Sequence, residues 1–169
     1  MQAAAKKNII LTGFMGTGKS TVGRLLARQL GYEFVDTDLL IEKREKMSVT
    51  DIFQQRGETA FRALERMVAK ELGEKSSLVI ATGGGLLLDH KNAQHLERTG
   101  KIFCLVASSD EILKRILSDD DRPLLQVENP SERISELLQK RQKGYGRFPQ
   151  VITSGKTVLQ VVNELMDHL

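Results

Sequence analysis

One segment of this 169-residue sequence restricts its fold more than any other: residues 13–20, which read GFMGTGKS. The segment matches every fixed position of the phosphate-binding loop, or P-loop, in which the final lysine is followed by serine or threonine. An apolar run at 8–12 precedes it, and apolar residues recur at helical spacing over 20–30. This order of strand, loop and helix predicts an α/β domain that holds a nucleotide by its phosphate groups.

The residues of the loop have separate expected tasks. Lys19 brings a positive charge to the β- and γ-phosphates, and Ser20 is expected to ligate Mg²⁺. A second glycine-lysine-threonine triplet begins at Gly155, but Gln150 stands where its first glycine is needed, so Gly155 is interpreted as an ordinary loop residue. The residues of this region that we expect to bind ATP are Gly13, Gly16, Thr17, Gly18, Lys19, Ser20 and Thr21.

Apolar runs and helical patterns alternate along the rest of the chain. Further strands are predicted at 32–35, 77–81, 101–106 and 150–153. Further helices are predicted from about 39, at 49–72 with an interruption at Gly57, and at 109–117, 131–143 and 157–169. The alternation predicts a parallel sheet covered on both faces, with ligands at the carboxyl ends of the strands. The length suits a single domain, residues 1–169.

Charged and small residues follow the second and third predicted strands. Asp36 and Asp38 put two carboxylates at a strand end, where one can face a metal and the other a substrate hydroxyl, although such residues can also simply cap a helix. Arg62 and Glu65 lie one helical turn apart, so Glu65 can orient a guanidinium that grips a carboxylate. The glycines at 83–85 allow a ligand to approach the backbone closely.

Further positive charge in the second half of the chain comes from Arg115, Arg122, Arg141 and Arg147. Arg122 follows three aspartates in a polar stretch, and a mobile lid is predicted over about 112–125. Two or three of these arginines on one polar pocket would suit an anionic substrate and the charge that develops on a transferred phosphoryl group.

Together these segments resemble the shikimate kinase family. The resemblance rests on residues 13–20, the DTD at 36–38, the GETAFRALE at 57–65, the glycines at 83–85 and the RPLL at 122–125, and it covers nearly the whole chain. It implies ATP-dependent phosphorylation of the shikimate 3-hydroxyl, a step of aromatic amino-acid biosynthesis. The implied fold is that of the nucleoside-monophosphate kinases, and we expect a three-layer α/β/α P-loop kinase with five parallel strands in the order 2-3-1-4-5.

The resemblance also implies how the acceptor is held. Asp38 would bind the shikimate hydroxyls next to the attacking oxygen, as a base or an orienting group. Arg62 and Arg141 would bind the shikimate carboxylate, and the backbone of Gly83, Gly84 and Gly85 would contact the ring hydroxyls. The family usually has proline and leucine between the second arginine and a tyrosine, whereas Gly144 stands at the leucine position here. The helix is therefore expected to end earlier or to flex more than in relatives.

On the nucleotide side, the resemblance implies that Ser20 and Asp36 hold Mg²⁺, Asp36 through water. Lys19 and Arg122 would stabilise the transferred phosphoryl group, Arg122 arriving as the lid closes. Arg115 would stack near adenine. The implied catalytic residues are thus Lys19, Asp38 and Arg122.

Three other functions remain open at this point. One is another small-molecule kinase of the same fold, such as a gluconate or nucleotide kinase, but the presence of Asp38 and Arg62 argues against it. A GTP-binding switch needs an Asn/Thr-Lys-x-Asp segment, and none occurs. A nucleic-acid-binding protein would suit the pI of about 9.0, but the net charge is only +3 and 5% of residues are aromatic.

The remaining composition predicts an ordinary cytoplasmic enzyme. Residues 1–7 do not resemble a signal peptide, and no segment is long and apolar enough to span a membrane. Cys104 is the single cysteine and falls in an apolar run, so we expect a core residue. The expected partners are ATP and shikimate, without nucleic acid or membrane, and the expected state is a monomer.

Overall fold

Five parallel strands form the centre of the molecule. The structure is a computed structural model that describes residues 6–118 and 128–169. All four strand pairings are parallel, and the strand order is β2-β3-β1-β4-β5, as predicted. The strands are β1 (Asn8–Thr12), β2 (Glu33–Asp36), β3 (Leu78–Ala81), β4 (Gly100–Val106) and β5 (Gln150–Ile152).

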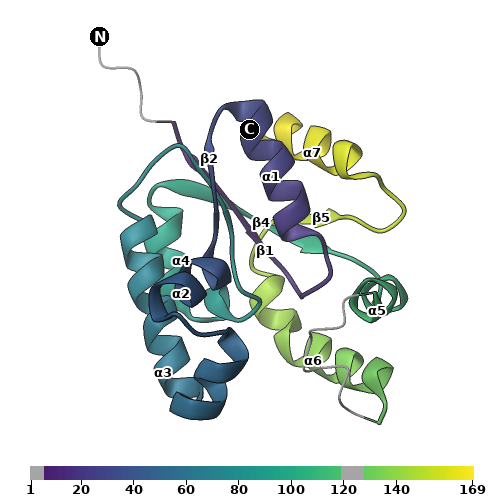
Figure 1. The fold of residues 1–169 in the computed structure, drawn as a ribbon. Helices are drawn as coiled ribbons and strands as arrows, with labels where there is room; N and C mark the ends of the chain where they lie inside the picture. The colour runs from purple at the N-terminus through teal and green to yellow at the C-terminus, as the bar shows by residue number, and fades with distance from the viewer. Residues whose placement is uncertain (1–5, 119–127) are drawn as a thin grey trace.

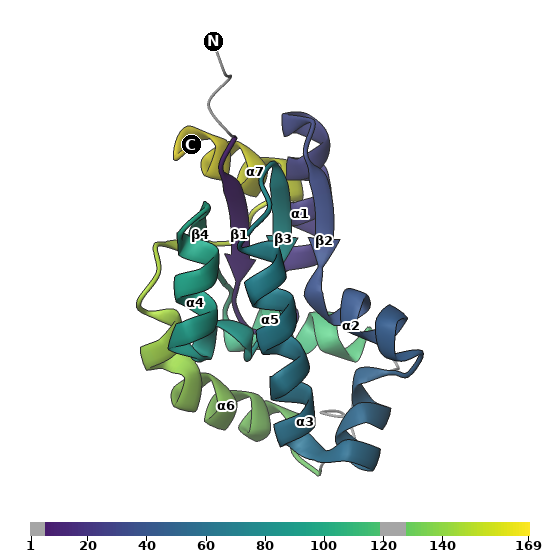
Figure 2. The same cartoon turned by 90° about the vertical axis from the view of Figure 1, so that its left-hand side faces the viewer.

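Helices cover both faces of this sheet. The helices are α1 (Lys19–Leu30), α2 (Thr37–Glu45), α3 (Val49–Leu72), α4 (His90–Glu97), α5 (Ser109–Leu117), α6 (Pro130–Tyr145) and α7 (Val158–Asp167), with a 3₁₀ turn η1 at Leu86–Leu88. Helices α1 and α7 lie on one face, and α3 and α4 lie on the other (Figure 1). Figure 2 shows α3 and α4 in front of the strands. The predicted three-layer α/β/α arrangement is confirmed.

The two faces of the sheet bury separate apolar clusters. All five residues of the central strand β1 are buried, which explains why its three inner residues, 9–11, are all apolar rather than alternating with polar ones. Cys104 is 1% exposed and belongs to the cluster under α3 and α4. Burial raises the pKa of its thiol to about 11, so the prediction of an inert core cysteine is confirmed. None of the described helices combines the length and apolar character needed to cross a membrane.

Three local features differ from, or refine, the sequence-based expectations. Gly57 has φ 82° and ψ 171° and interrupts α3 as predicted. No helix was predicted at α4, because its eight residues are mostly polar and only Ala93 and Leu96 provide buried apolar side chains. The helix predicted at 131–143 runs further than expected, since α6 continues through Gly144 to Tyr145. A Cβ on Gly144 would overlap Leu88 Cδ2, so glycine lets α6 pack against η1.

The end of α3 packs so closely on α4 that we expect substitution there to be costly. A Cβ on Gly73 would lie 2.5 Å from the carbonyl oxygen of His95, which belongs to the backbone and cannot rotate away. Gly73→Ala should therefore lower the free energy of unfolding by about 1–3 kcal/mol, measured by urea denaturation.

Gly146→Ala is the matched control for this prediction. Gly146 ends α6 with φ −65° and ψ −10°, against −66° and −10° for Gly73, but a Cβ on it meets nothing closer than 3.1 Å. The control should change stability by less than about 0.5 kcal/mol. Equal effects of the two substitutions would mean that the helix end, and not the contact with His95, sets the cost.

Candidate active site

The carboxyl ends of the strands open onto a cavity of about 1040 Å³. Most of the site residues predicted from sequence line it. They are Gly16, Gly18, Lys19, Ser20, Thr21, Asp36, Asp38, Arg62, Gly83, Gly84, Gly85, Arg115 and Arg141. Gly13 and Thr17 do not line this cavity, and Thr17 instead donates its buried hydroxyl to the Phe14 carbonyl at 2.7 Å. Arg122 lies outside the described residues, so its role stays a prediction.

The P-loop joins β1 to α1 in the conformation that the sequence pattern predicts. Gly13, Gly16 and Gly18 have φ angles of 135°, 78° and 96°, which side-chain-bearing residues rarely adopt. Helix α1 starts at Lys19, so the N–H groups of its first turn, which have no partner within a regular helix, lie beside the loop. The Lys19 ammonium group donates to the carbonyl oxygens of Gly13 at 2.8 Å and Phe14 at 2.9 Å. A positive charge is thus held at the phosphate-binding end of the cavity.

Ser20 and Asp36 form a pair of oxygen donors beside the loop. The Ser20 hydroxyl donates to Asp36 Oδ2 at 2.7 Å. Asp36 Oδ1 accepts from the backbone N–H groups of Asp38 at 3.0 Å and Leu39 at 3.2 Å, so Asp36 also caps α2. Among the described residues no three His, Cys, Asp or Glu side chains gather as a metal cage. A hydroxyl and one carboxylate fit Mg²⁺, which completes its octahedron with nucleotide phosphates and water.

Among the described aspartates, Asp38 has the pKa that is shifted furthest from its ordinary value. Its Oδ1 atom is buried and accepts no hydrogen bond from them. Burial, and then repulsion by Asp36, raise the pKa of Asp38 from 3.8 to about 6, while the positive charges of Lys19 and Arg62 act in the opposite direction. A carboxylate with an open acceptor and a pKa near neutrality is suited to taking a hydrogen bond, or a proton, from a bound hydroxyl.

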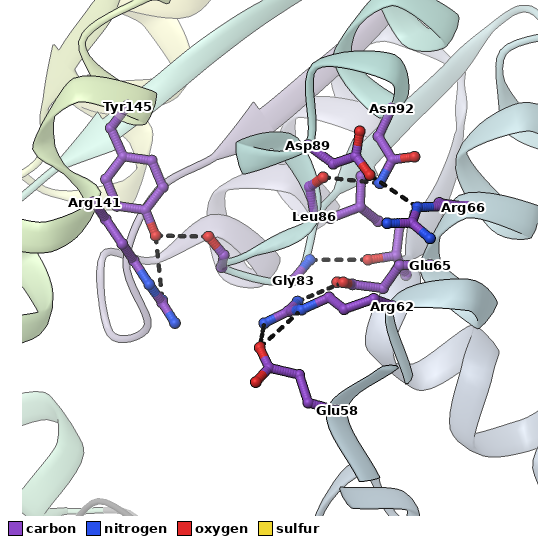
Figure 3. A network of polar contacts seen from close by, with 12 residues as sticks. Glu58, Arg62, Glu65, Arg66, Gly83, Leu86, Asp89, Asn92, Arg141 and Tyr145 are labelled. Carbon is purple, nitrogen blue, oxygen red and sulfur yellow. Dashed lines mark hydrogen bonds and ion pairs between the residues drawn. The ribbon is translucent and has the colours of Figure 1, made fainter. Parts of the chain in front are cut away.

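Arg62 is fixed by two glutamates of its own helix (Figure 3). Its Nη1 atom lies 2.5 Å from Glu65 Oε1, and its Nη2 atom lies 3.3 Å from Glu58 Oε1. The Glu65 side chain is only 1% exposed, and burial raises the pKa of its carboxyl to about 7, although the hydrogen bond from Arg62 opposes this rise. The pairing of Arg62 with Glu65 predicted from their spacing is confirmed.

Arg141 reaches the same cavity from α6. Its guanidinium carbon lies 5.5 Å from the centre of the Phe14 ring, and its Nη1 atom lies 3.4 Å from the hydroxyl oxygen of Tyr145. That hydroxyl donates to the carbonyl oxygen of Gly84 at 2.7 Å (Figure 3). Sequence reasoning overlooked Tyr145 and Phe14 as site residues. The only available signal was the four-residue spacing of Tyr145 from Arg141.

Thr37 also supports the site without having been predicted. Its buried hydroxyl accepts from the Gly83 N–H at 2.9 Å and so ties the start of α2 to the glycine loop. Arg115 covers the P-loop, where its Nη1 donates to the Gly16 carbonyl at 2.8 Å. Arg147 does not line the cavity, because its Nη2 donates to the Leu87 carbonyl at 2.6 Å. Of Arg115, Arg141 and Arg147, only the first two therefore line the cavity.

The strand order, the P-loop at the end of β1 and the helices on both faces define a P-loop kinase fold. A family model described as shikimate kinase matches residues 15–169. The chain belongs to the shikimate kinase family.

Relatives and solved structures agree with this membership. A shikimate kinase of Thermodesulfovibrio yellowstonii is 48% identical over 161 residues, which span 95% of this chain and 93% of the relative. A shikimate kinase from Acinetobacter baumannii, solved in complex with shikimate, superposes with a TM-score of 0.90 at 36% identity and covers 96% of this chain and 92% of its own. A gluconokinase from Sinorhizobium meliloti has a TM-score of 0.61 at 17% identity, covering 98% of this chain and 92% of its own, and shares the fold alone.

Proposed function

We propose that this chain transfers the γ-phosphoryl group of ATP to the 3-hydroxyl of shikimate, giving shikimate 3-phosphate and ADP. The observation that carries the proposal is the position of Asp38, which lines the same cavity as Lys19 and Arg62 and has a buried Oδ1 atom without a hydrogen-bond partner among the described residues. Asp38 would serve the hydroxyl of the acceptor, Lys19 the transferred phosphoryl group, and Arg62 the carboxylate of the acceptor. Membership of the shikimate kinase family supports the choice of acceptor.

On the nucleotide side, the loop would bind the ATP phosphates with its backbone N–H groups and the amino end of α1. Lys19 would exchange its bonds to the loop carbonyls for contacts with the β- and γ-phosphates. Arg115, which already bonds the loop at Gly16, would bind near the nucleotide. Arg122 would join Lys19 around the transferred group after closure of a lid over about 112–125. Closure would exclude water and so limit wasteful hydrolysis of ATP.

Ser20 and Asp36 would hold Mg²⁺, with Asp36 acting through a water molecule. When bound, the ion screens the negative charge that the phosphates accumulate during transfer. Asp36 is well placed for this because its Oδ1 atom is already occupied by the cap of α2, which leaves Oδ2 directed toward Ser20. The backbone of α2 therefore orients the carboxylate.

On the acceptor side, Arg62 and Arg141 would bind the shikimate carboxylate from two different helices. This clamp would orient the ring so that its 3-hydroxyl lies at Asp38. Because phosphoryl transfer demands positioning more than covalent catalysis, a rigid Arg62 is an advantage, and Glu65 and Glu58 provide that rigidity. We also propose that the enzyme works as a monomer in the cytoplasm.

The test of this proposal is ADP release from ATP and Mg²⁺ by the purified protein, with shikimate, quinate, gluconate or nucleoside monophosphates as acceptors. Shikimate should stimulate release far more than the others. Stimulation by gluconate or a nucleotide instead would contradict the acceptor while leaving the P-loop kinase class intact. Repeating the assay with EDTA in place of Mg²⁺ should abolish turnover.

The dependence of catalysis on pH should follow the Asp38 carboxyl. Because this group must be ionised to accept the hydroxyl proton or hydrogen bond, kcat/KM for shikimate should fall about tenfold per pH unit below its pKa of about 6 and level off above it. Glu65→Gln removes the other carboxyl with a raised pKa and should keep this acid limb. A flat profile from pH 5 to 7, or a limb lost in Glu65→Gln, would remove Asp38 as its source.

A further inference from the structure

The three glycines at 83–85 lie at the carboxyl end of β3, between the strand and η1. Their backbone does not need glycine for conformational reasons. None of the three has a φ angle in the left-handed region, and Gly85 has φ −100° and ψ −9°, which other residues adopt readily. An alanine at any of these positions would therefore leave the backbone unstrained. The absence of a side chain must be explained by what lies beside each Cα atom.

Each glycine faces a different acceptor-binding side chain. A Cβ on Gly83 would lie 2.5 Å from Asp38 Oδ1. A Cβ on Gly85 would lie 2.6 Å from Nη1 and 2.8 Å from Nη2 of Arg62. Carbon atoms do not approach oxygen or nitrogen this closely, so the side-chain head or the loop would have to move.

Gly84 faces the third side chain of the set. A Cβ on Gly84 would lie 2.9 Å from Arg141 Nη1 and 3.4 Å from the hydroxyl oxygen of Tyr145. Figure 3 shows Arg141 and Arg62 on opposite sides of the loop. Three successive residues thus border three side chains that come from α2, α6 and α3.

Hydrogen bonds on both sides hold the backbone of the loop in place. Gly83 donates its N–H to Thr37 at 2.9 Å, and its carbonyl accepts from the Leu86 N–H at 3.1 Å. Asn92 then donates to the Leu86 carbonyl at 3.0 Å, and Tyr145 holds the Gly84 carbonyl. A methyl group added to this loop would therefore displace the end of the facing side chain, which can rotate about its single bonds, and leave the backbone in place.

We propose that Gly83, Gly84 and Gly85 are positioning residues because they have no side chain. Gly83 leaves room for the carboxylate of Asp38, Gly84 for the guanidinium of Arg141, and Gly85 for the guanidinium of Arg62. This inference rests on the proposed function. It differs from the role that the family resemblance implies, in which the glycine backbone itself contacts the ring hydroxyls. On that reading, alanine at any of the three positions would obstruct the acceptor in the same way.

Kinetics of the three alanine variants separate these readings. Gly83→Ala should lower kcat by about 100-fold, because displacement of a reacting group by about 1 Å has an effect of this size, and should leave the KM for shikimate near that of the parent. Gly85→Ala should raise the KM for shikimate by about tenfold or more through the loss of charge-assisted hydrogen bonds. Gly84→Ala should raise it less, because its methyl would press on one guanidinium nitrogen only.

Two further measurements distinguish positioning from a merely structural effect. In an Arg62→Ala background, Gly85→Ala should have no further effect on kcat/KM, because the side chain that it displaces is already gone. Crystal structures of the variants should show movement of only the facing head, and this readout needs no turnover. Midpoints of thermal unfolding should stay close to that of the parent.

The result that would overturn the inference is a rise in the KM for shikimate of similar size in all three variants, or an undiminished effect of Gly85→Ala when Arg62 is absent. Heads that stay in place in the variant crystal structures would also overturn it. Failure of the proposed function looks different, because the unsubstituted protein would then show no shikimate-dependent release of ADP.

Discussion

Asp38→Asn is expected to lower shikimate-dependent turnover by about 10²–10⁴-fold, the range typical of the loss of a general base. The amide has nearly the shape of the carboxylate but cannot accept the proton or carry the negative charge. ATP should bind with nearly unchanged affinity, because the P-loop and the Ser20–Asp36 pair remain. Steady-state kinetics and titration with a fluorescent ATP analogue would test both parts. Retained turnover would remove Asp38 from the chemistry.

The same substitution should stabilise the folded protein without ligands. The pKa of Asp38 is about 6 in the folded protein against 3.8 as its reference value, so between these values the folded protein binds more protons than the unfolded chain. The contribution of this group to stability is therefore complete below about pH 4 and is lost as pH rises through 6. At pH 7, Asp38→Asn should raise the free energy of unfolding by the order of 2 kcal/mol.

Denaturant titrations at pH 4, 5, 6 and 7 measure this effect. The difference between variant and parent should grow with pH and level off above pH 6. Asp36→Ala is a useful contrast, because it removes the side chain that caps α2 and bonds Ser20, and should destabilise by about 1 kcal/mol. If Asp38→Asn were less stable than the parent at pH 7, burial of the ionised Asp38 carboxylate would not destabilise the folded protein, and this interpretation would be wrong.

Arg62→Ala should raise the KM for shikimate by about 10–100-fold, the effect expected from loss of hydrogen bonds between charged groups, and should change the KM for ATP little. The guanidinium is held by Glu65 at 2.5 Å and Glu58 at 3.3 Å, so it meets its ligand already oriented. Its removal also leaves Glu65 buried without a partner, which should raise the pKa of that carboxyl further.

Arg66→Ala serves as the matched control. Arg66 follows one turn later on α3, its side chain is 58% exposed, and it bonds Asp89 at 2.9 Å away from the cavity. This variant should keep the KM for shikimate within about twofold of the parent, because exposed pairs contribute at most about 1 kcal/mol. Equal increases in the KM values for shikimate and ATP in Arg62→Ala would contradict a carboxylate clamp.

Much of the fold could be predicted from local patterns. The P-loop was correct, because the apolar run 8–12, the glycine loop and the amphipathic α1 are adjacent in sequence and each has a distinct pattern. The strand order was also correct, but it came from the family resemblance and not from any local pattern. Helix α4 was missed because its few apolar residues show no clear period. The helix predicted to end at 143 continues to Tyr145, and the missing side chain of Gly144 makes room for Leu88, which is a neighbour in space and not in sequence.

Most residues of the site could be predicted from the sequence, but their hydrogen-bond partners could be predicted only in part. Arg62 and Glu65 could be paired from their spacing on one helix. Tyr145 could not be connected to Gly84, because 61 residues separate them and only the packing of α6 against η1 brings them together. The sequence likewise offered Arg147 on the same terms as Arg141, and the structure directs Arg147 to the Leu87 carbonyl instead.

The sequence by itself determined the class of fold, the phosphate loop and the charged residues at the ends of the strands, because each depends on neighbours a few positions away. The tertiary structure determined which arginines line the cavity, the raised pKa of Asp38 and the close contacts beside the three glycines after β3. Burial and close contact depend on the packing of α2, α3 and α6 around one cavity, and no local pattern contains that information.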